Sequence, residues 1–153
     1  STLMRSSAAS DVYKRQKFVY DRNQIMAILN QESSLMEIVK LIGSDVLPDD
    51  QKLTLEIARV IRLGFLQQNA FHQEDTSVPM EKQFLMMETI LYLYEKCRAL
   101  VNRGMPVSVL KEDNIFERII AIKYEVPNKE LERFDEYHKD IDRFYDNVLE
   151  RNG

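Results

Sequence analysis

Apolar residues recur at three- and four-residue steps along most of this chain, and this spacing constrains the fold more than any other feature. It puts apolar side chains on one face of a helix, whereas a half-buried strand needs strict alternation, which no stretch sustains. In the first helical stretch, the recurring residues are Ile25, Ile28, Leu29, Leu35 or Met36, Val39 and Ile42. The pattern predicts an all-α fold, a bundle of about 4–6 helices.

Glycine and proline residues mark where the first helices end and begin. Gly43 stands where a left-handed residue would end the first helix, and Pro48 suits the first position of the next. Asp49 and Asp50 would then lie in the first turn, where negative charge opposes the positive end of the helix dipole. The apolar face of this second helix comprises Leu53, Ile57, Val60 and Ile61.

The second half of the chain has the same organisation. A long helix is expected from about Pro79 to Arg103, with Gly104 as its stop. Two short helices follow, in PVSVLKE, which Pro106 opens, and in FERIIAIKY. After Pro127 a last helix carries charged residues over most of its surface, which indicates a solvated amphipathic helix. Its apolar side comprises Leu131, Phe134, Ile141, Tyr145 and Val148.

Composition narrows the class of protein. With 153 residues and 44% hydrophobic residues, the chain is long enough for one domain with a substantial core. The net charge of −4 gives no basic face for nucleic acid. No apolar run approaches the roughly 18 residues of a membrane span, so no direct membrane insertion is expected. A single cysteine, Cys97, makes no internal disulfide and fits a reducing cytosol, where packing is its expected role.

The first residues, STLMRSSAASDVYKRQ, fit neither a signal peptide nor the helical pattern, because no apolar core segment follows them. Translated backward, DVYKRQ corresponds to GAT GTG TAT AAG AGA CAG. These codons resemble the mosaic end of the transposon used to prepare sequencing libraries. We therefore expect residues 1–16 to be a non-native leader, disordered or only incidentally helical, and the domain proper to comprise residues 17–153.

Motifs for self-sufficient catalysis are absent from the sequence. It contains no G-x-x-x-x-G-K-[ST] phosphate loop and no G-x-G-x-x-G turn. Neither His72 nor His138 has a partner at a metal-ligand spacing, and we expect His138 to be a partly exposed helix residue. The sequence therefore predicts no metal site and no catalytic residue, and the chain alone is not expected to turn over a substrate.

Two stretches are more specific than generic helix. They are Ile38–Arg62, IVKLIGSDVLPDDQKLTLEIARVIR, and Phe65–Gln83, which contains LQQNAF, D-T and P-x-E-K-Q in that order. Together they resemble the C-terminal helical domain of the catalytic A subunit of V-type and archaeal-type rotary ATPases. The resemblance begins near Tyr20 and weakens after Met105.

Two departures from the family pattern stand out. Val78-Pro79-Met80 replaces the more usual Cys-Pro-Pro. Leu63-Gly64 replaces an acidic pair, and Gly64 is a residue that can loosen the helix end before LQQ.

The resemblance implies that LQQNAF forms one edge of an adenine pocket. Phe71 would lie against the adenine ring, with Gln68 and Ala70 nearby and Phe65 as a further candidate. A flat aromatic face holds a base without a charged group. The alternative for Phe65 and Phe71 is that both are core aromatic residues of the bundle.

The resemblance also implies that SDVLPDD, at the tip of the first two helices, faces a central rotor stalk. Asp45, Asp49 and Asp50 would present negative charge to the stalk, and Leu47 would offer an apolar contact. Pro48 would stiffen the turn, so that it transmits a push without flexing. The alternative is an ordinary acidic turn before a helix.

For the intact protein, the resemblance implies an ATP-hydrolysing or ATP-synthesising subunit coupled to H⁺ or Na⁺ transport. ATP or ADP with Mg²⁺ would bind mainly to an upstream domain, so the fragment itself is expected to hold no cofactor. The expected partners are the non-catalytic B subunits and the central rotor stalk, in a cytoplasmic assembly peripheral to a membrane. Exposed apolar surface on the first helix makes self-association of the isolated fragment an expectation.

Two alternatives stay open at this point. One is a free-standing helical adaptor or scaffold domain with no nucleotide role, in which LQQNAF only packs. The other is the non-catalytic B subunit of the same motor, which the pairing of LQQNAF with EKQ disfavours.

Overall fold

The computed structural model describes residues 2–67 and 79–152, with side chains from residue 8 onward. The four long helices are α1 (Thr2–Ile42), α2 (Asp49–Ile61), α3 (Met80–Asn102) and α7 (Phe134–Asn152). The shorter elements are a π-helical turn (Arg62–Leu66), α4 (Val107–Leu110), a 3₁₀ turn (Lys111–Asp113), α5 (Ile115–Ile120), α6 (Ile122–Glu125) and a second 3₁₀ turn (Leu131–Arg133). No strand occurs in these two ranges, so the all-α prediction is confirmed for them.

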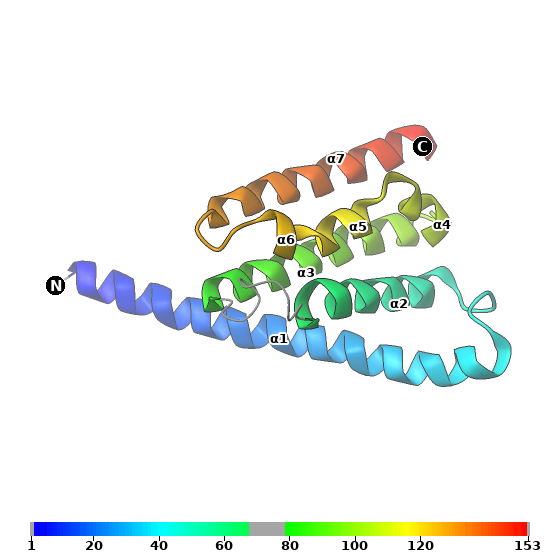
Figure 1. Ribbon diagram of the computed structural model, residues 1–153, viewed down its shortest axis with the longest axis horizontal. Coiled ribbons are helices and arrows are strands. Elements are labelled where there is room, and N and C mark those ends of the chain that lie inside the picture. Colours follow the sequence, from blue (N-terminus) through cyan, green and yellow to red (C-terminus); the bar gives the residue numbers. More distant parts are fainter. Residues whose placement is uncertain (1, 68–78, 153) are drawn as a thin grey trace.

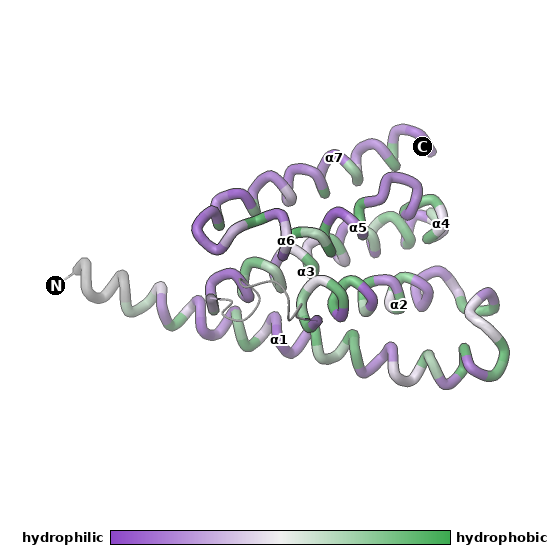
Figure 2. The backbone as a smooth tube through the Cα atoms, viewed as in Figure 1, coloured by the Kyte–Doolittle hydropathy of each residue, from purple (hydrophilic) through white to green (hydrophobic). Residues whose placement is uncertain are grey.

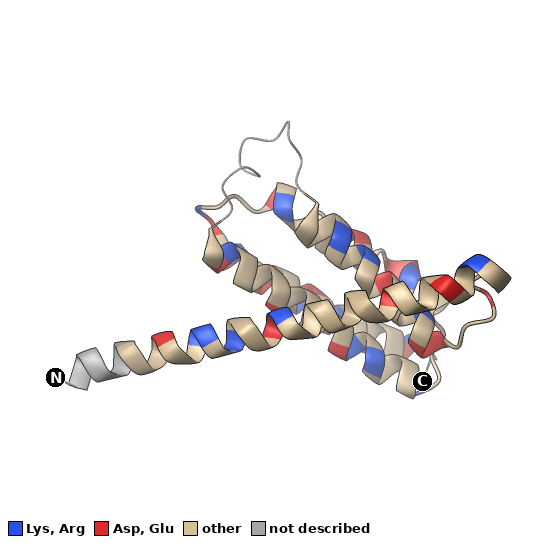
Figure 3. Cartoon of the chain, turned by 90° about the horizontal axis from the view of Figure 1, so that it is seen from below, with Lys and Arg blue, Asp and Glu red and all other residues tan. Residues whose placement is uncertain are grey.

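The helices form a layered bundle (Figure 1). Helices α1 and α2 make an antiparallel hairpin, and both pack against α3. Helix α3 also packs against α7, while the short α5 contacts α2, α7 and the π-helical turn. The N-terminal part of α1 extends beyond the other helices, as Figure 1 and the view from below in Figure 3 both show.

The core follows the apolar positions that the sequence pattern predicts. Leu53, Ile57, Val60 and Ile61 on α2 are fully buried, and Phe134, Ile141 and Val148 supply the inner face of α7. Ile42 differs, because it is 62% exposed at the end of α1. Figure 2 shows the contrast, since α7 is mostly hydrophilic whereas hydrophobic residues continue to the turn after α1.

The helix ends are set as the sequence predicts, with small shifts in the boundaries. Gly43, at φ +86°, ends α1, and Gly104, at φ +93°, follows α3; both conformations favour glycine. Pro48 was expected at the first position of α2 but immediately precedes it, with its carbonyl accepting hydrogen bonds from the amides of Gln51 and Lys52. Proline suits this place because it has no amide hydrogen to leave unpaired.

The predicted leader is part of the same helix as the residues that follow it. From residue 8 to residue 16 every side chain is exposed, and α1 first contributes half-buried side chains at Lys17 and Phe18. Residues 8–16 of the predicted leader, whose side chains the structure describes, therefore add nothing to the core. Whether it is native stays a prediction.

Within the two described ranges, none of the helices combines the length and the apolar character needed to cross a membrane. The same residues contain no cluster of three or more His, Cys, Asp or Glu side chains able to hold a metal ion.

Candidate functional site

The turn between α1 and α2 forms one end of the molecule. Asp45, Pro48 and Asp50 are exposed there, and Asp49 is half-buried. Leu47, by contrast, is only 6% exposed and points into the domain. Of the predicted tip residues, Asp45, Pro48 and Asp50 are therefore the ones that an outside partner can reach directly.

Asp49 has a structural partner inside the domain. Its Oδ1 accepts a hydrogen bond of 3.0 Å from the backbone amide of Val107, the first residue of α4. The amides in the first turn of a helix have no acceptor within the helix, and the Asp49 carboxylate is the acceptor for one of them. Asp49 thus fastens the base of the tip to the segment after α3.

Apolar side chains on the outside of the tip come from residues other than Leu47. Leu41 is 84% exposed, Ile42 62% and Val46 59%. Large apolar side chains with such exposure on adjacent turns are typical of a surface that contacts another protein. The apolar side chains on the outer surface of the tip are therefore Leu41, Ile42 and Val46, and not Leu47.

Helix α2 connects the tip directly to the LQQ motif. It continues without a break into the π-helical turn, which ends where the amide of Gln67 donates to the carbonyl of Arg62 over 2.8 Å. A Cβ added to Gly64 would lie 3.2 Å from the Cα of Ile120. The absence of a side chain at Gly64 therefore lets the π-helical turn pack closely against the end of α5. That Gly64 loosens the helix end before LQQ stays a prediction.

Of the four candidates for the adenine pocket, Phe65 alone is among the described residues. Gln68, Ala70 and Phe71, together with His72, lie outside the described residues. Phe65 is half-buried and packs against the core, which agrees with its alternative as a core aromatic residue. The carbonyl of Gln67 accepts a hydrogen bond from the ammonium of Lys123, which anchors the start of the motif to α6.

Lys82, in the EKQ part of the motif, is a buried charged residue that the sequence analysis did not single out. It is 3% exposed, and its Nζ donates to the carbonyl of Val126 over 2.7 Å and to Oδ1 of Asn128 over 3.0 Å. A positive charge in the first turn of a helix is unfavourable, because it lies next to the positive end of the helix dipole. A lysine at this position could therefore have indicated from the sequence that a specific partner holds it. Lys82 ties the start of α3 to the turn before α7.

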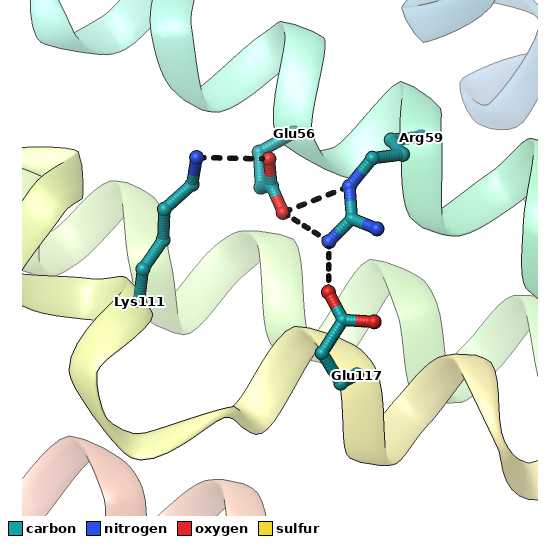
Figure 4. A network of polar contacts seen from close by, with 4 residues as sticks. All are labelled: Glu56, Arg59, Lys111 and Glu117. Atoms are coloured by element: carbon teal, nitrogen blue, oxygen red, sulfur yellow. Dashed lines mark hydrogen bonds and ion pairs between the residues drawn. The ribbon is translucent and has the colours of Figure 1, made fainter.

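A charged network joins α2 to the short helices (Figure 4). Glu56 is 8% exposed, and its carboxylate lies 2.6 Å from Nη2 of Arg59 and 3.5 Å from Nζ of Lys111. Arg59 also contacts Glu117 of α5. The hydrogen bond that Arg59 donates to Glu56 is the main reason why the pKa of Arg59 lies above its ordinary value. A further ion pair, Arg62 to Glu32 at 2.7 Å, joins the π-helical turn to α1.

The single described histidine and the cysteine have packing roles. His138 is half-buried, and its Nε2 lies 3.2 Å from Oγ1 of Thr89, whose hydroxyl donates to the carbonyl of Leu85. The Thr89 oxygen must then accept from the histidine, so Nε2 carries the hydrogen. Cys97 is fully buried, and its burial raises the pKa of the thiol to about 12. Both predictions, a partly exposed helix histidine and a packing cysteine, are confirmed.

Comparison with known proteins decides the family. The family described as "C-terminal domain of V and A type ATP synthase" matches residues 9–109, which include the tip, α2, the π-helical turn and α3. This chain belongs to that family.

Similarity to individual proteins supports the same family assignment. The chain is 44% identical over 130 residues to "V-type ATP synthase alpha chain 2" of Clostridium tetani, covering 85% of this chain and 22% of the relative. It is 44% identical over 129 residues to "V-type ATP synthase alpha chain" of Halothermothrix orenii, covering 84% and 22%. It is 43% identical over 130 residues to the A subunit of the A-type ATP synthase of Methanopyrus kandleri, again covering 84% and 22%. The chain thus spans about a fifth of the length of these relatives.

Proposed function

We propose that this V/A-type domain is the lever of a catalytic subunit that hydrolyses or synthesises ATP in a rotary motor coupled to H⁺ or Na⁺ transport. One end of the lever would contact the central stalk, and the other would form the edge of the adenine pocket. The names of the relatives, all alpha or A subunits of ATP synthases, support the assignment to this subunit.

The continuity of α2 carries this proposal. The helix begins at the tip, runs through the centre of the core and passes directly into the π-helical turn before LQQ. A helix packed on several sides moves as a rigid body, because close-packed interiors transmit strain rather than absorb it. Displacement of the tip would therefore reach the motif, and a change at the motif would reach the tip.

At the stalk end, Leu41, Ile42 and Val46 supply exposed apolar surface, and Asp45 and Asp50 supply negative charge. An apolar centre with charged neighbours suits a contact that must hold while the partner turns, since apolar contact is non-directional. We assign stalk contact to these residues, with Pro48 stiffening the turn. Leu47 and Asp49 would support the tip from inside.

At the nucleotide end, we assign the adenine contact to Phe71, with Gln68 and Ala70 beside it. Phe65 would support the pocket from the core side, where it is half-buried. ATP or ADP and its Mg²⁺ would bind mainly to an upstream domain, which would supply the phosphate loop and the catalytic residues. This chain would hold and orient the base and exclude water from one side of it.

The partners that follow from this proposal are the non-catalytic B subunits and the central stalk. The intact subunit would then lie at the cytoplasmic side of a membrane, within a peripheral complex. By itself the chain is expected to hydrolyse no ATP, and the exposed apolar side of α1 is expected to favour self-association of the isolated domain.

An exchange experiment tests both ends of the lever. Residues 17–153 would replace the aligned C-terminal part of the Clostridium tetani alpha chain 2, and ATP hydrolysis of the assembled enzyme would be measured. We expect activity, and we expect Phe71→Ala to raise KM for ATP about tenfold through loss of base stacking. Phe84→Ala is the control, because Phe84 is half-buried on α3 and stacks against Phe18 instead.

Two results would contradict the proposal. The first is an assembled exchange enzyme without hydrolysis. The second is a Phe71→Ala variant whose KM for ATP equals that of Phe84→Ala. Either result would favour a helical adaptor without a nucleotide role, in which LQQNAF only packs.

A further inference from the structure

A completely buried carboxylate lies where α1 meets α3. Asp21 is 0% exposed, and its Oδ2 has no hydrogen-bond partner among the described residues. Burying a carboxylate oxygen without a partner costs free energy, and buried polar atoms in folded proteins are rarely left in this state. Oδ2 of Asp21 is therefore a site for a hydrogen-bond donor.

The groups next to Asp21 identify that donor. Lys17, one turn earlier on α1, places its Nζ 3.1 Å from Oδ1 of Asp21 and 3.9 Å from Oε2 of Glu88 on α3. The ammonium thus satisfies Oδ1 and leaves Oδ2. Burial, and after it the neighbouring Asp21 carboxylate, raise the pKa of Glu88 to about 7. A protonated Glu88 is the donor that Oδ2 lacks.

We propose that Glu88 is protonated and donates a hydrogen bond to Oδ2 of the buried Asp21, and that this bond fastens α1 to α3 as a pH-dependent latch. Two carboxylates in contact repel one another when both are ionised, whereas one proton converts the repulsion into a short charge-assisted hydrogen bond. The Lys17 ammonium already lies beside the pair, so a proton, rather than a second cation, completes the site.

Other titratable groups face the same cleft and must be separated from the pair. On α1 they are Lys17 and Tyr20, with Tyr13 acting on Lys17; on α3 they are Tyr92, Tyr94, Glu95 and Arg98; on α7 the group is His138. Tyr92 is held by Asp142, which raises the pKa of its phenol to about 12. Burial lowers the pKa of His138. The His138 imidazole therefore also contributes to the dependence of stability on pH and has to be separated from Glu88.

The two groups have opposite effects on stability. An unfolded glutamate has a pKa of about 4.3, so from there to about pH 7 the folded chain holds a proton at Glu88 that the unfolded chain has lost. The folding equilibrium constant then falls by up to about tenfold per pH unit as pH rises through this window. His138, with its lowered pKa, makes stability rise with pH just below its ordinary value.

The test is urea unfolding of this chain at a series of pH values from 5 to 8, for wild type, Glu88→Gln and Glu95→Gln. In Glu88→Gln the new side-chain amide stays neutral and can still donate to Asp21, so we expect the fall in stability with pH to disappear. Glu95→Gln is the matched control, because Glu95 is exposed in the same cleft, two turns further along α3. It should keep the wild-type dependence on pH.

A direct titration of the Glu88 carboxyl carbon by NMR keeps the proposal testable if the variant does not fold. We expect a midpoint near 7 in the wild type. We expect it to move toward about 4.3 in Asp21→Asn, which removes the negative partner. A midpoint near 4.3 in the wild type, or a Glu88→Gln chain with an unchanged dependence on pH, would overturn the proposal.

Discussion

Helices α1 and α7 are both long and both carry many charges, but they use their apolar residues differently. Helix α7 turns Phe134, Tyr137, Ile141, Phe144 and Val148 into the core. Helix α1 is more than twice as long, yet Ile25 and Ile28 are its only completely buried apolar residues in the described range. Nine of the thirteen exposed large apolar residues of the described chain lie on α1.

This difference indicates which parts of the domain are complete in themselves. A single apolar stripe, as on α7, is covered once the helix packs against one neighbour. Apolar residues on more than one side, as on α1, need a second cover that this domain does not supply. Helix α1, with the tip that follows it, is therefore the part of the described chain that leaves the most large apolar side chains uncovered.

The largest expected difference lies between the tip and the core at Cys97 on α3, and it is in thiol reactivity. Cys97 is fully buried, and its thiol pKa is raised to about 12, whereas a cysteine at the exposed position 41 would have an ordinary pKa of about 8.5. At pH 8, Leu41→Cys in a Cys97→Ala chain should react with a disulfide reagent at least roughly a thousandfold faster than native Cys97. The rates should converge in urea. Native rates within tenfold of one another would show that the α3 core opens as readily as the tip.

The next difference is in stability. Ile141 on α7 is 0% exposed, whereas Ile42 on α1 is 62% exposed. The same change to alanine should therefore affect the free energy of unfolding very differently at the two positions. Ile141→Ala should lower the free energy of unfolding by about 2–5 kcal/mol, because it leaves a cavity. Ile42→Ala should change it by less than about 0.5 kcal/mol in the isolated chain. Urea midpoints measure both, and equal losses would mean that Ile42 is covered in solution, for example by a second copy of the chain.

The smallest difference concerns charged pairs. Arg59→Met leaves the nearly buried Glu56 with Lys111 as its remaining ion-pair partner at 3.5 Å, and should cost about 1–2 kcal/mol. Lys40→Met removes an exposed pair on α1, in which Lys40 lies 3.8 Å from Glu37, and should cost less than about 0.5 kcal/mol. Urea unfolding in low salt measures both losses. Equal losses would show that the nearly buried Glu56 carboxylate does not need Arg59 to be stabilised in the folded chain.

Helical periodicity predicted most of the bundle because it reports which side of each helix is buried. The apolar faces of α2 and α7 and the stops at Gly43 and Gly104 could all be read from the sequence. Ile42 was assigned to a buried face because it continues the α1 pattern, but it lies beyond the last turn that α2 covers. The π-helical turn at Gly64 was not predictable, since it depends on the close approach of Ile120 from a later part of the chain.

The polar residues of the site were harder to predict than the apolar ones. Asp49 reads as a helix-start charge, and only the structure reveals its bond to Val107. Asp21, Glu56 and Lys82 are all buried. Asp21 pairs with Lys17 of its own helix, whereas Glu56 and Lys82 find partners on other elements, at Lys111 and at the carbonyl of Val126. A charged residue in a helical sequence reads as exposed unless the partner is known, so periodicity alone misplaces such residues.

The account depends most on the claim that the tip of α1 and α2 drives or is driven by an outside partner. The direct measurement is the number of ions transported per ATP in the exchange enzyme, reconstituted in vesicles, with Leu41, Ile42 and Val46 all changed to Ser. Met26→Ser is the control, because Met26 is exposed on α1 away from the tip. We predict that the tip variant transports fewer ions per ATP, with KM for ATP unchanged. A ratio equal to that of Met26→Ser would contradict the lever.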